Sequence, residues 1–331
     1  MVIKLFIMQR LKRLLLTLTN KKDNALRVFI HIPKTAGTSF RASLEKNEHV
    51  IRDYGDGKEH TSVIVNEHVY HSNDLYALKE SLSNRDTWLC GHMHLIKYLG
   101  IAEPQNMVTF VRDPVARVIS HFNHEARWGN CDVTIENFLN SNNAKNSQHR
   151  FLNALPISLI GFVGITEQYS QSLALLDSQM AIKVEEAKFN ENDKKVSDVD
   201  DLDAETLARI KEQNTLDQQL YTSAINLLAE RETLEREQKA WTYIYAAVSK
   251  DRKLRGIAYR TKASNPVELE VAVNGKAYRD LIASELTPLF PSVRFPRERF
   301  VGFSVSLHKH QNIENIVLTV KDTGQSYNVE I

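Results

Sequence analysis

The chain has little cysteine, no excess of either charge and no long apolar run. Only Cys90 and Cys131 occur among 331 residues. Because two cysteines give no disulfide framework, a reducing compartment is expected. The 42 lysine and arginine residues against 41 aspartate and glutamate residues give a net charge of +1, so nothing global indicates a nucleic-acid partner and any basic site must be local. This length, with 42% hydrophobic residues, predicts a globular protein of about two domains.

The N-terminal segment 1–24 mixes apolar residues with Lys4, Arg10, Lys12 and Arg13. These charges interrupt every apolar stretch well before the roughly 20 residues that span a bilayer. No small-residue cleavage site of a signal peptide follows. We therefore expect a cytoplasmic protein whose basic amphipathic N-terminus either packs on the domain or contacts a membrane surface peripherally.

Two patterns divide the rest of the chain. Over residues 25–250, short β-type runs alternate with helical patterns, which predicts an α/β domain with a parallel sheet flanked by helices. Within it, residues 205–248 have the apolar spacing of long helix. Further on, apolar and polar residues alternate, and Asn274-Gly275 is a strong hairpin signal. We expect residues 251–331 to form a small β-rich, sandwich-like accessory domain.

The stretch HIPKTAGTS, residues 31–39, has the composition of an anion-binding loop. Gly37 allows successive backbone N–H groups to converge on one anion, and the following helix adds positive potential at its N-terminus. Lys34 supplies a full charge, and Thr38 or Ser39 can cap the helix. In a loop that binds Mg²⁺ and a triphosphate, the lysine directly follows a glycine and precedes the metal-binding hydroxyl. Here Lys34 precedes Gly37 by three residues, which weakens the interpretation as a nucleotide kinase.

A second anion motif is TFVRDPVARVISHF, residues 109–122. Its apolar strand ends at Arg112, Asp113 can cap a helix, and Pro114 suits the first helical turn. The Arg112 guanidinium then lies at a helix N-terminus, where it can bind a phosphate in a bidentate manner. The alternatives are that Arg112 only pairs with a carboxylate and that Ser120 is an ordinary helix serine. Two phosphate sites on neighbouring strand ends fit a nucleotide that is phosphorylated at both its 3′ and 5′ positions.

Together, these two motifs closely resemble the cofactor-binding signatures of the carbohydrate sulfotransferases, the group with membrane-bound Golgi enzymes and their bacterial relatives. FVGITEQYSQSLALL (162–176) and NTLDQQLYTSA (214–224) resemble later segments of that family, so the likeness covers residues 25–248. It implies a P-loop-like fold and sulfuryl transfer from 3′-phosphoadenosine 5′-phosphosulfate (PAPS) to a sugar hydroxyl. The implied donor-binding residues are Lys34, Thr35, Ala36, Gly37, Thr38 and Ser39 for the 5′-phosphosulfate, and Arg112 and Ser120 for the 3′-phosphate.

The segment WLCGHMHLIKYLG, residues 88–100, carries the candidate general base. It resembles the Gly-His segment with the proposed base of uronyl 2-O-sulfotransferases, which implicates His92. A neutral imidazole can accept the proton of an alcohol as the bond to sulfur forms. His94 points the same way in an extended segment and is the second candidate. The alternatives are a His-x-His metal pair and two structural histidines, whereas His31 is expected to be a polar strand-end residue.

We therefore expect a PAPS-dependent sulfotransferase that acts on a carbohydrate or polysaccharide hydroxyl and needs no metal ion. The sulfuryl group carries less negative charge than a γ-phosphoryl group, so N–H groups and one lysine can stabilise an in-line displacement. The expected catalytic residues are Lys34, His92 and His94. Two other classes stay open, an ATP-dependent phosphotransferase and a non-catalytic carbohydrate-binding protein. The accessory domain either helps to recognise a polymeric acceptor or only stabilises the enzyme.

Overall fold

A computed structural model of the protein describes residues 26–128, 134–182, 184, 198–261, 263–308, 312–329 and 331. The predictions for segment 1–24 and for Cys131 lie outside these residues. No helix in the described part of the chain is long and apolar enough to cross a membrane.

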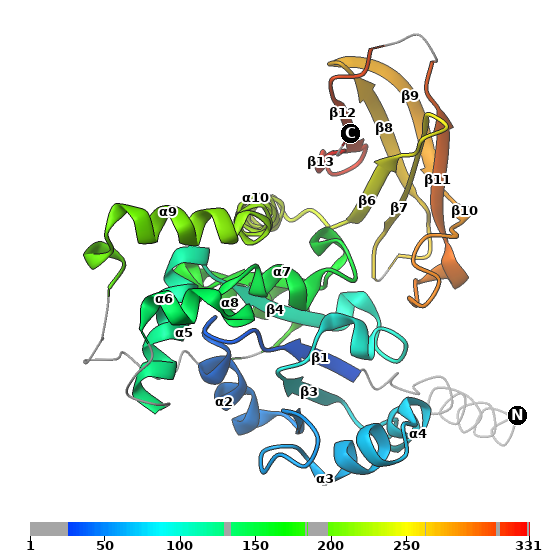
Figure 1. The fold of residues 1–331 in the computed structure, drawn as a ribbon. Helices are drawn as coiled ribbons and strands as arrows, with labels where there is room; N and C mark the ends of the chain where they lie inside the picture. Colours follow the sequence, from blue (N-terminus) through cyan, green and yellow to red (C-terminus); the bar gives the residue numbers. More distant parts are fainter. Residues whose placement is uncertain are drawn as a thin grey trace, which may run out of the picture.

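Five parallel strands form the centre of the first region, in the order β2-β3-β1-β4-β5 (Figure 1). β3, β4 and β5 are buried along their whole length, as is typical of parallel strands covered on both faces. The predicted α/β architecture is therefore confirmed. The strands are β1 Leu26–Ile30, β2 Val50–Asp53, β3 Thr87–Gly91, β4 Met107–Val111 and β5 Phe162–Ile165.

Helices fill the connections between these strands. From β1 the chain passes to β2 on one side of the sheet, whereas β4 and β5 lie on the other side. Such a switch point, at the carboxyl ends of the strands, is where open α/β sheets bind ligands. The helices are α2 Gly37–Asn47, α3 Val63–Val65, α4 Leu75–Ser81, α5 Pro114–Trp128, α6 Ile135–Asn140, α7 Ser147–Leu152, α8 Tyr169–Met180, α9 Ala204–Gln213 and α10 Thr215–Arg236.

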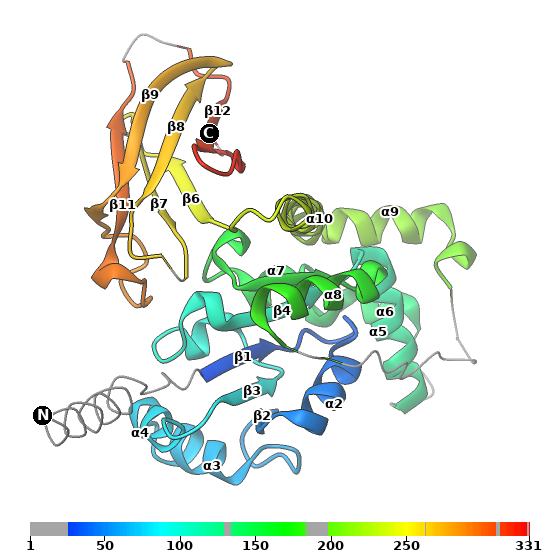
Figure 2. The ribbon, with the colours of Figure 1, turned by 180° about the vertical axis from the view of Figure 1, so that it is seen from behind.

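The C-terminal region is a sandwich of two antiparallel sheets, in the orders β10-β11-β7-β6 and β13-β12-β8-β9 (Figures 1 and 2). The turn at Asn274 and Gly275, with φ angles of 50° and 73°, joins β8 to β9 and confirms the predicted hairpin. The strands are β6 Tyr243–Val248, β7 Lys253–Tyr259, β8 Val267–Val273, β9 Lys276–Ala283, β10 Glu285–Leu286, β11 Phe300–Ser306, β12 Ile316–Val320 and β13 Ser326–Asn328.

The sandwich begins before the expected boundary at residue 251. β6 pairs with β7 along its whole length, from Tyr243 opposite Tyr259 to Val248 opposite Leu254. Since α10 ends at Arg236, the helix predicted over residues 205–248 is wrong from residue 237 onward, and residues 243–248 form a strand instead. A short apolar run such as YIYAAV fits a buried helix segment or a strand equally well, and only its pairing with β7 decides between them.

The two regions share a hydrophobic core. At their junction Arg231 of α10 is almost fully buried, and its Nη2 donates to the Gly161 carbonyl at 2.8 Å. Its guanidinium carbon lies 4.0 Å from the centroid of the Trp241 ring, so a cation–π contact helps to offset its desolvation. The sandwich is thus packed onto the first region, which it joins through the buried side chains of Tyr243, Ile257, Tyr259, Val293, Phe295 and Val301.

Candidate active site

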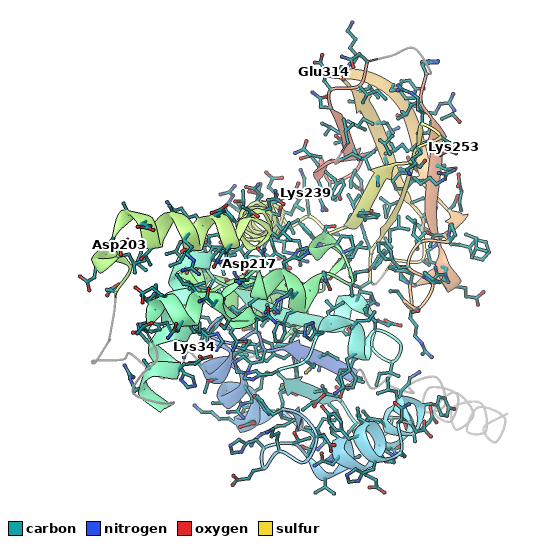
Figure 3. The ribbon with its side chains drawn as sticks, in the orientation of Figure 1. Lys34, Asp203, Asp217, Lys239, Lys253 and Glu314 are labelled. Carbon is teal, nitrogen blue, oxygen red and sulfur yellow. The ribbon has the colours of Figure 1, made fainter. Side chains whose placement is uncertain are left out.

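The ends of three neighbouring strands bring the predicted site residues to one edge of the sheet. The loop 31–39 follows β1, His92 follows β3, and Arg112 follows β4. Because β1 pairs in parallel with both β3 and β4, the three segments leave the sheet side by side. Figure 3 shows Lys34 at this edge, between α2 and α5.

Two left-handed residues shape the anion-binding loop. The φ angles of Lys34 and Ala36 are 73° and 62°. Between them, the buried hydroxyl of Thr35 donates to the Ile32 carbonyl at 2.9 Å and ties the loop to the end of β1. Alternation of left-handed and ordinary conformations turns successive N–H groups toward one point, which is a concavity suited to an anion.

Gly37 begins α2 and lies against His31. A Cβ at position 37 would be 2.0 Å from His31 Cδ2, so any other residue would have to displace the His31 ring. The N-cap position belongs to Ala36 and not, as expected, to Thr38 or Ser39, which lie in the first turn. The first N–H groups of a helix have no acceptor within the helix. They therefore add to the positive potential at the loop.

Cations gather around Lys34. Burial lowers the pKa of the Lys34 amine, and the nearby charges of Arg112 and Arg127 lower it further. Burial likewise lowers the pKa of His124 on α5, with Lys34 as the next cause. Cations that depress one another's pKa values are stabilised by a bound anion. The positive charge around Lys34, like the shape of the loop, is therefore suited to a bound anion.

Arg112 is held through both its backbone and its side chain. The side-chain amide of Gln148 accepts from Arg112 N and donates to Arg112 O, each at 2.8 Å. The guanidinium donates from Nη1 to the Lys34 carbonyl at 3.3 Å, and its Nε lies 3.7 Å from Glu167 Oε1. Arg112 thus joins the second anion motif to the first. It also lies beside a carboxylate, Glu167, as expected if its role were only to form an ion pair.

The start of α5 follows the prediction from sequence. Asp113 accepts a hydrogen bond from Ala116 N at 2.9 Å, and the helix begins at Pro114. Ser120 lies half-buried about 9 Å along the helix axis from Pro114. Its contact with a 3′-phosphate stays a prediction.

His92 lies among aromatic rings at the same edge. Its ring centroid is 4.5 Å from that of His31 and 4.8 Å from that of Tyr54, whose hydroxyl is 3.3 Å from His31 Nδ1. His92 is an exposed residue, but the atoms packed around its ring still disfavour the charged form. This partial desolvation lowers the pKa of His92 to about 4, with Arg41 and His124 contributing. The ring is neutral at pH 7, the state that can accept a proton.

Comparison with known protein families matches residues 18–222 to the sulfotransferase family. The chain belongs to this family. The match covers the parallel sheet and all of the strand ends described above, and it stops within α10, before the sandwich. Comparison with curated proteins gives no match. Among the residues that the structure describes, the sulfotransferase has no group of three or more His, Cys, Asp or Glu side chains placed to hold a metal ion.

His94 of the sulfotransferase contacts α7 and not the His92 cluster. Its Nδ1 lies 2.7 Å from the Arg150 carbonyl, and its ring stacks on Phe151 with a centroid distance of 4.7 Å. The segment is not extended beyond this point, because a 3₁₀ turn begins at Leu95. The expectation that both histidines point the same way is therefore not met, and a catalytic role for His94 stays a prediction.

Asp53 fixes the segment that carries His92. Its carboxylate accepts hydrogen bonds from Lys97 Nζ at 2.6 Å, Tyr98 at 2.7 Å and Tyr70 at 2.6 Å. Burial alone would raise the pKa of Asp53, but these hydrogen bonds, led by that of Lys97, hold it below its ordinary value. The end of β2 is thereby tied to the turn that follows His92.

Several positioning residues of the sulfotransferase were missed in the sequence. Asp217 of α10 accepts from the backbone N–H groups of Gln148 and His149, at 3.2 and 2.7 Å, and so fixes the start of α7 (Figure 3). Glu167 accepts from Tyr221 at 3.0 Å and lies beside Arg112. Glu167 lies in the segment 162–176 and Asp217 in the segment 214–224, so the resemblance of these segments to the family could have indicated both residues. Gln148 lies in no such segment.

Proposed function

We propose that this sulfotransferase moves the sulfuryl group of PAPS to a hydroxyl of a carbohydrate, with His92 as general base. The observation that carries the proposal is the pairing of two anion sites at one sheet edge, with Arg112 only 3.3 Å from the Lys34 carbonyl. One nucleotide with phosphate groups at its 3′ and 5′ positions suits both sites, whereas a triphosphate would use the first alone. A cytoplasmic location belongs to the proposal, with segment 1–24 either packed on the domain or in peripheral contact with a membrane surface.

The donor fits the residues that surround the loop. The N–H groups of residues 35–39 and the Lys34 amine would hold the 5′-phosphosulfate, and Arg112 with Ser120 would hold the 3′-phosphate. PAPS supplies the sulfuryl group, and PAP is the leaving group. Negative charge grows on the oxygen between phosphorus and sulfur as that S–O bond breaks, so Lys34 stabilises both the ground state and the transition state.

His92 acts on the other side of the sulfur atom. It accepts the proton of the acceptor hydroxyl while the oxygen of that hydroxyl forms its bond to sulfur. The negative charges of the bound donor raise the pKa of His92 above its value of about 4 in the ligand-free protein. Donor binding therefore strengthens the base that the reaction needs.

The test is calorimetry with PAP, AMP and ATP, each measured once in EDTA and once with Mg²⁺. We expect PAP to bind about 10 to 100 times more tightly than AMP, which lacks only the 3′-phosphate, because that phosphate receives charge-assisted hydrogen bonds. Transfer of ³⁵S from labelled PAPS to a panel of neutral and acidic polysaccharides then tests the reaction. Tight ATP binding that requires Mg²⁺, with no response to PAP, would replace the proposal with a phosphotransferase.

A further inference from the structure

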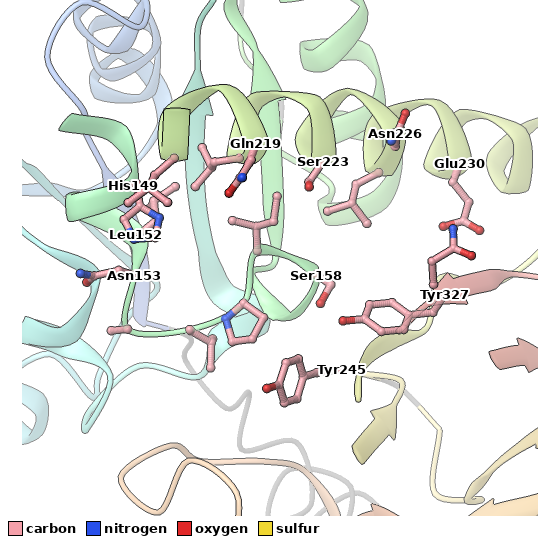
Figure 4. Close-up of a pocket in the computed structure, with 18 of the residues that line it drawn as sticks. His149, Leu152, Asn153, Ser158, Gln219, Ser223, Asn226, Glu230, Tyr245 and Tyr327 are labelled. Carbon is pink, nitrogen blue, oxygen red and sulfur yellow. The ribbon is translucent and has the colours of Figure 1, made fainter. Parts of the chain in front are cut away.

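A cavity of about 790 Å³ lies between the sulfotransferase region and the sandwich, beside the core that they share. One wall is α10, another is the turn at residues 153–158 after α7, and a third comes from β6 and β13 of the sandwich (Figure 4). We call this cavity the interdomain groove. None of the donor-site residues described above lines it, so it is separate from the site of sulfuryl transfer.

The groove presents aromatic rings beside uncharged polar groups. Tyr245, Tyr327 and Phe290 provide the rings, and the rings of Tyr245 and Phe290 lie 5.4 Å apart. Figure 4 shows Gln219 and Ser223 on α10, across the groove from the two tyrosines. Aromatic surface with a few placed hydrogen-bonding groups is suited to sugar rings, which have apolar C–H faces and hydroxyl edges. Besides the tyrosines, the amides and hydroxyls are those of Asn153, Ser158, Gln219, Ser223, Asn226, Ser326 and Asn328.

The charge of the groove contrasts with that of the donor site. No lysine or arginine is among the described residues that line it, and Glu230 is its one carboxylate. Oε1 of Glu230 accepts a hydrogen bond from Ser326 N at 2.9 Å, which joins α10 to β13. Burial raises the pKa of this carboxyl group. The described lining holds no permanent positive charge that would compensate a sulfate or a uronate, and its one imidazole, His149, lies at the Leu216 end, so the chemistry along most of the groove favours an uncharged ligand.

The groove leads toward the reaction edge of the sheet. Its lining runs along α10 from Leu216 to Glu230, which is about 21 Å of helix. At the Leu216 end, His149 lines the groove while the preceding residue, Gln148, holds Arg112. A linear ligand in the groove therefore extends from the sandwich toward the strand ends.

We propose that the interdomain groove is a remote acceptor subsite that binds an uncharged stretch of a linear carbohydrate. A hydroxyl elsewhere on the same chain reacts at the strand ends. This proposal rests on the proposed function, because that function supplies the carbohydrate. It predicts that affinity grows with acceptor length and falls when the stretch in the groove is already sulfated.

The full-length protein can be tested on an array of neutral oligosaccharides. The probes are β1,4-linked N-acetylglucosamine, β1,4-linked glucose and α1,4-linked glucose, each as one, three and five sugars, with a sulfated copy of each pentamer. We expect at least one neutral series to gain about tenfold in affinity from one sugar to five, and its sulfated copy to bind more weakly. Ser223→Trp should abolish this binding by filling the groove. Ser223→Ala and Thr222→Trp are the controls, because Thr222 is exposed on the same helix but does not line the groove.

Three results would overturn the proposal: no neutral probe binds, sulfated probes bind better, or Ser223→Trp binds as well as Thr222→Trp. PAP calorimetry on the same proteins separates this failure from failure of the proposed function. If PAP binds every variant but Ser223→Trp leaves sugar binding unchanged, only the proposed subsite is wrong. If PAP does not bind but sugar binding depends on Ser223, the groove is a carbohydrate site and the sulfotransferase mechanism is wrong.

Discussion

The imidazole of His31 lies over the α-carbon of Gly37, so closely that a Cβ there would be 2.0 Å from Cδ2 of the ring. This contact joins the end of β1 to the start of α2 across the anion-binding loop. The same imidazole also contacts the rings of His92 and Tyr54. One close approach therefore sets both the shape of the loop and the position of the candidate base.

Gly37→Ala should disturb both the shape of the anion-binding loop and the position of His92. The new methyl group must displace the His31 ring, and overpacking of this kind destabilises a protein by about 1 to 3 kcal/mol. We expect a lower melting temperature and weaker PAP binding. The double variant His31→Ala/Gly37→Ala removes the clash and should be more stable than the sum of the two single changes predicts. Strict additivity in denaturant unfolding would show that the contact has no energetic role.

Arg112 should control the preference for a 3′-phosphate. Removing its guanidinium by Arg112→Ala should bring the affinity for PAP close to that for AMP, a loss of about 10- to 100-fold for PAP alone. Glu167→Gln, which keeps the size of the neighbour but removes its charge, is the control and should preserve the preference. Calorimetry of both nucleotides measures it. Equal losses for PAP and AMP in Arg112→Ala would place this side chain away from the 3′-phosphate.

His92 and His94 should separate in kinetics. We expect His92→Ala to lower kcat by about 10² to 10⁴, the usual contribution of a positioned general base, and to leave PAP affinity nearly unchanged. His94→Ala loses its contacts with Arg150 and Phe151 and should mainly lower thermal stability. Lys34→Ala should lose both PAP affinity and turnover. A His92→Ala enzyme with wild-type kcat would remove this residue as the base.

Acid should destabilise the ligand-free protein through its neutral histidines. Burial, with help from Arg117 and Lys34, lowers the pKa of His121 to about 3 from the usual 6.5, and the pKa of the more exposed His92 is lowered as well. The unfolded chain thus takes up protons first, so this stability is complete above pH 6.5 and declines as the pH falls toward 4.

Thermal melts at constant ionic strength between pH 7 and 4 test this expectation. His121→Gln should make the free energy of unfolding fall less steeply with decreasing pH, by up to about 1.4 kcal/mol per pH unit. PAP should flatten the decline too, because its negative charge favours the protonated rings. A decline with the same slope in His121→Gln and in the wild type would assign the acid sensitivity to other groups.

The sheet and the two anion motifs could be predicted because their signals are local. An apolar run, a turn and a helix start lie within a few residues at both Lys34 and Arg112. The clamp on Arg112 could not be predicted, since Gln148 lies 36 residues from Arg112 and Asp217 lies 69 residues from Gln148. The same limit explains β6, whose identity depends on a partner strand and not on its own pattern.

The shared core at the Arg231 junction makes the two architectures one cooperative body. Heat should therefore unfold the α/β layer and the sandwich in a single transition, although the chain contains two sheet systems of different type. A nucleotide that binds at the strand ends should delay melting of the sandwich as well, because native-state ligands stabilise the whole cooperative unit. Substitutions at the junction would then change the temperature at which nucleotide binding is lost, although the substituted residues do not contact the nucleotide.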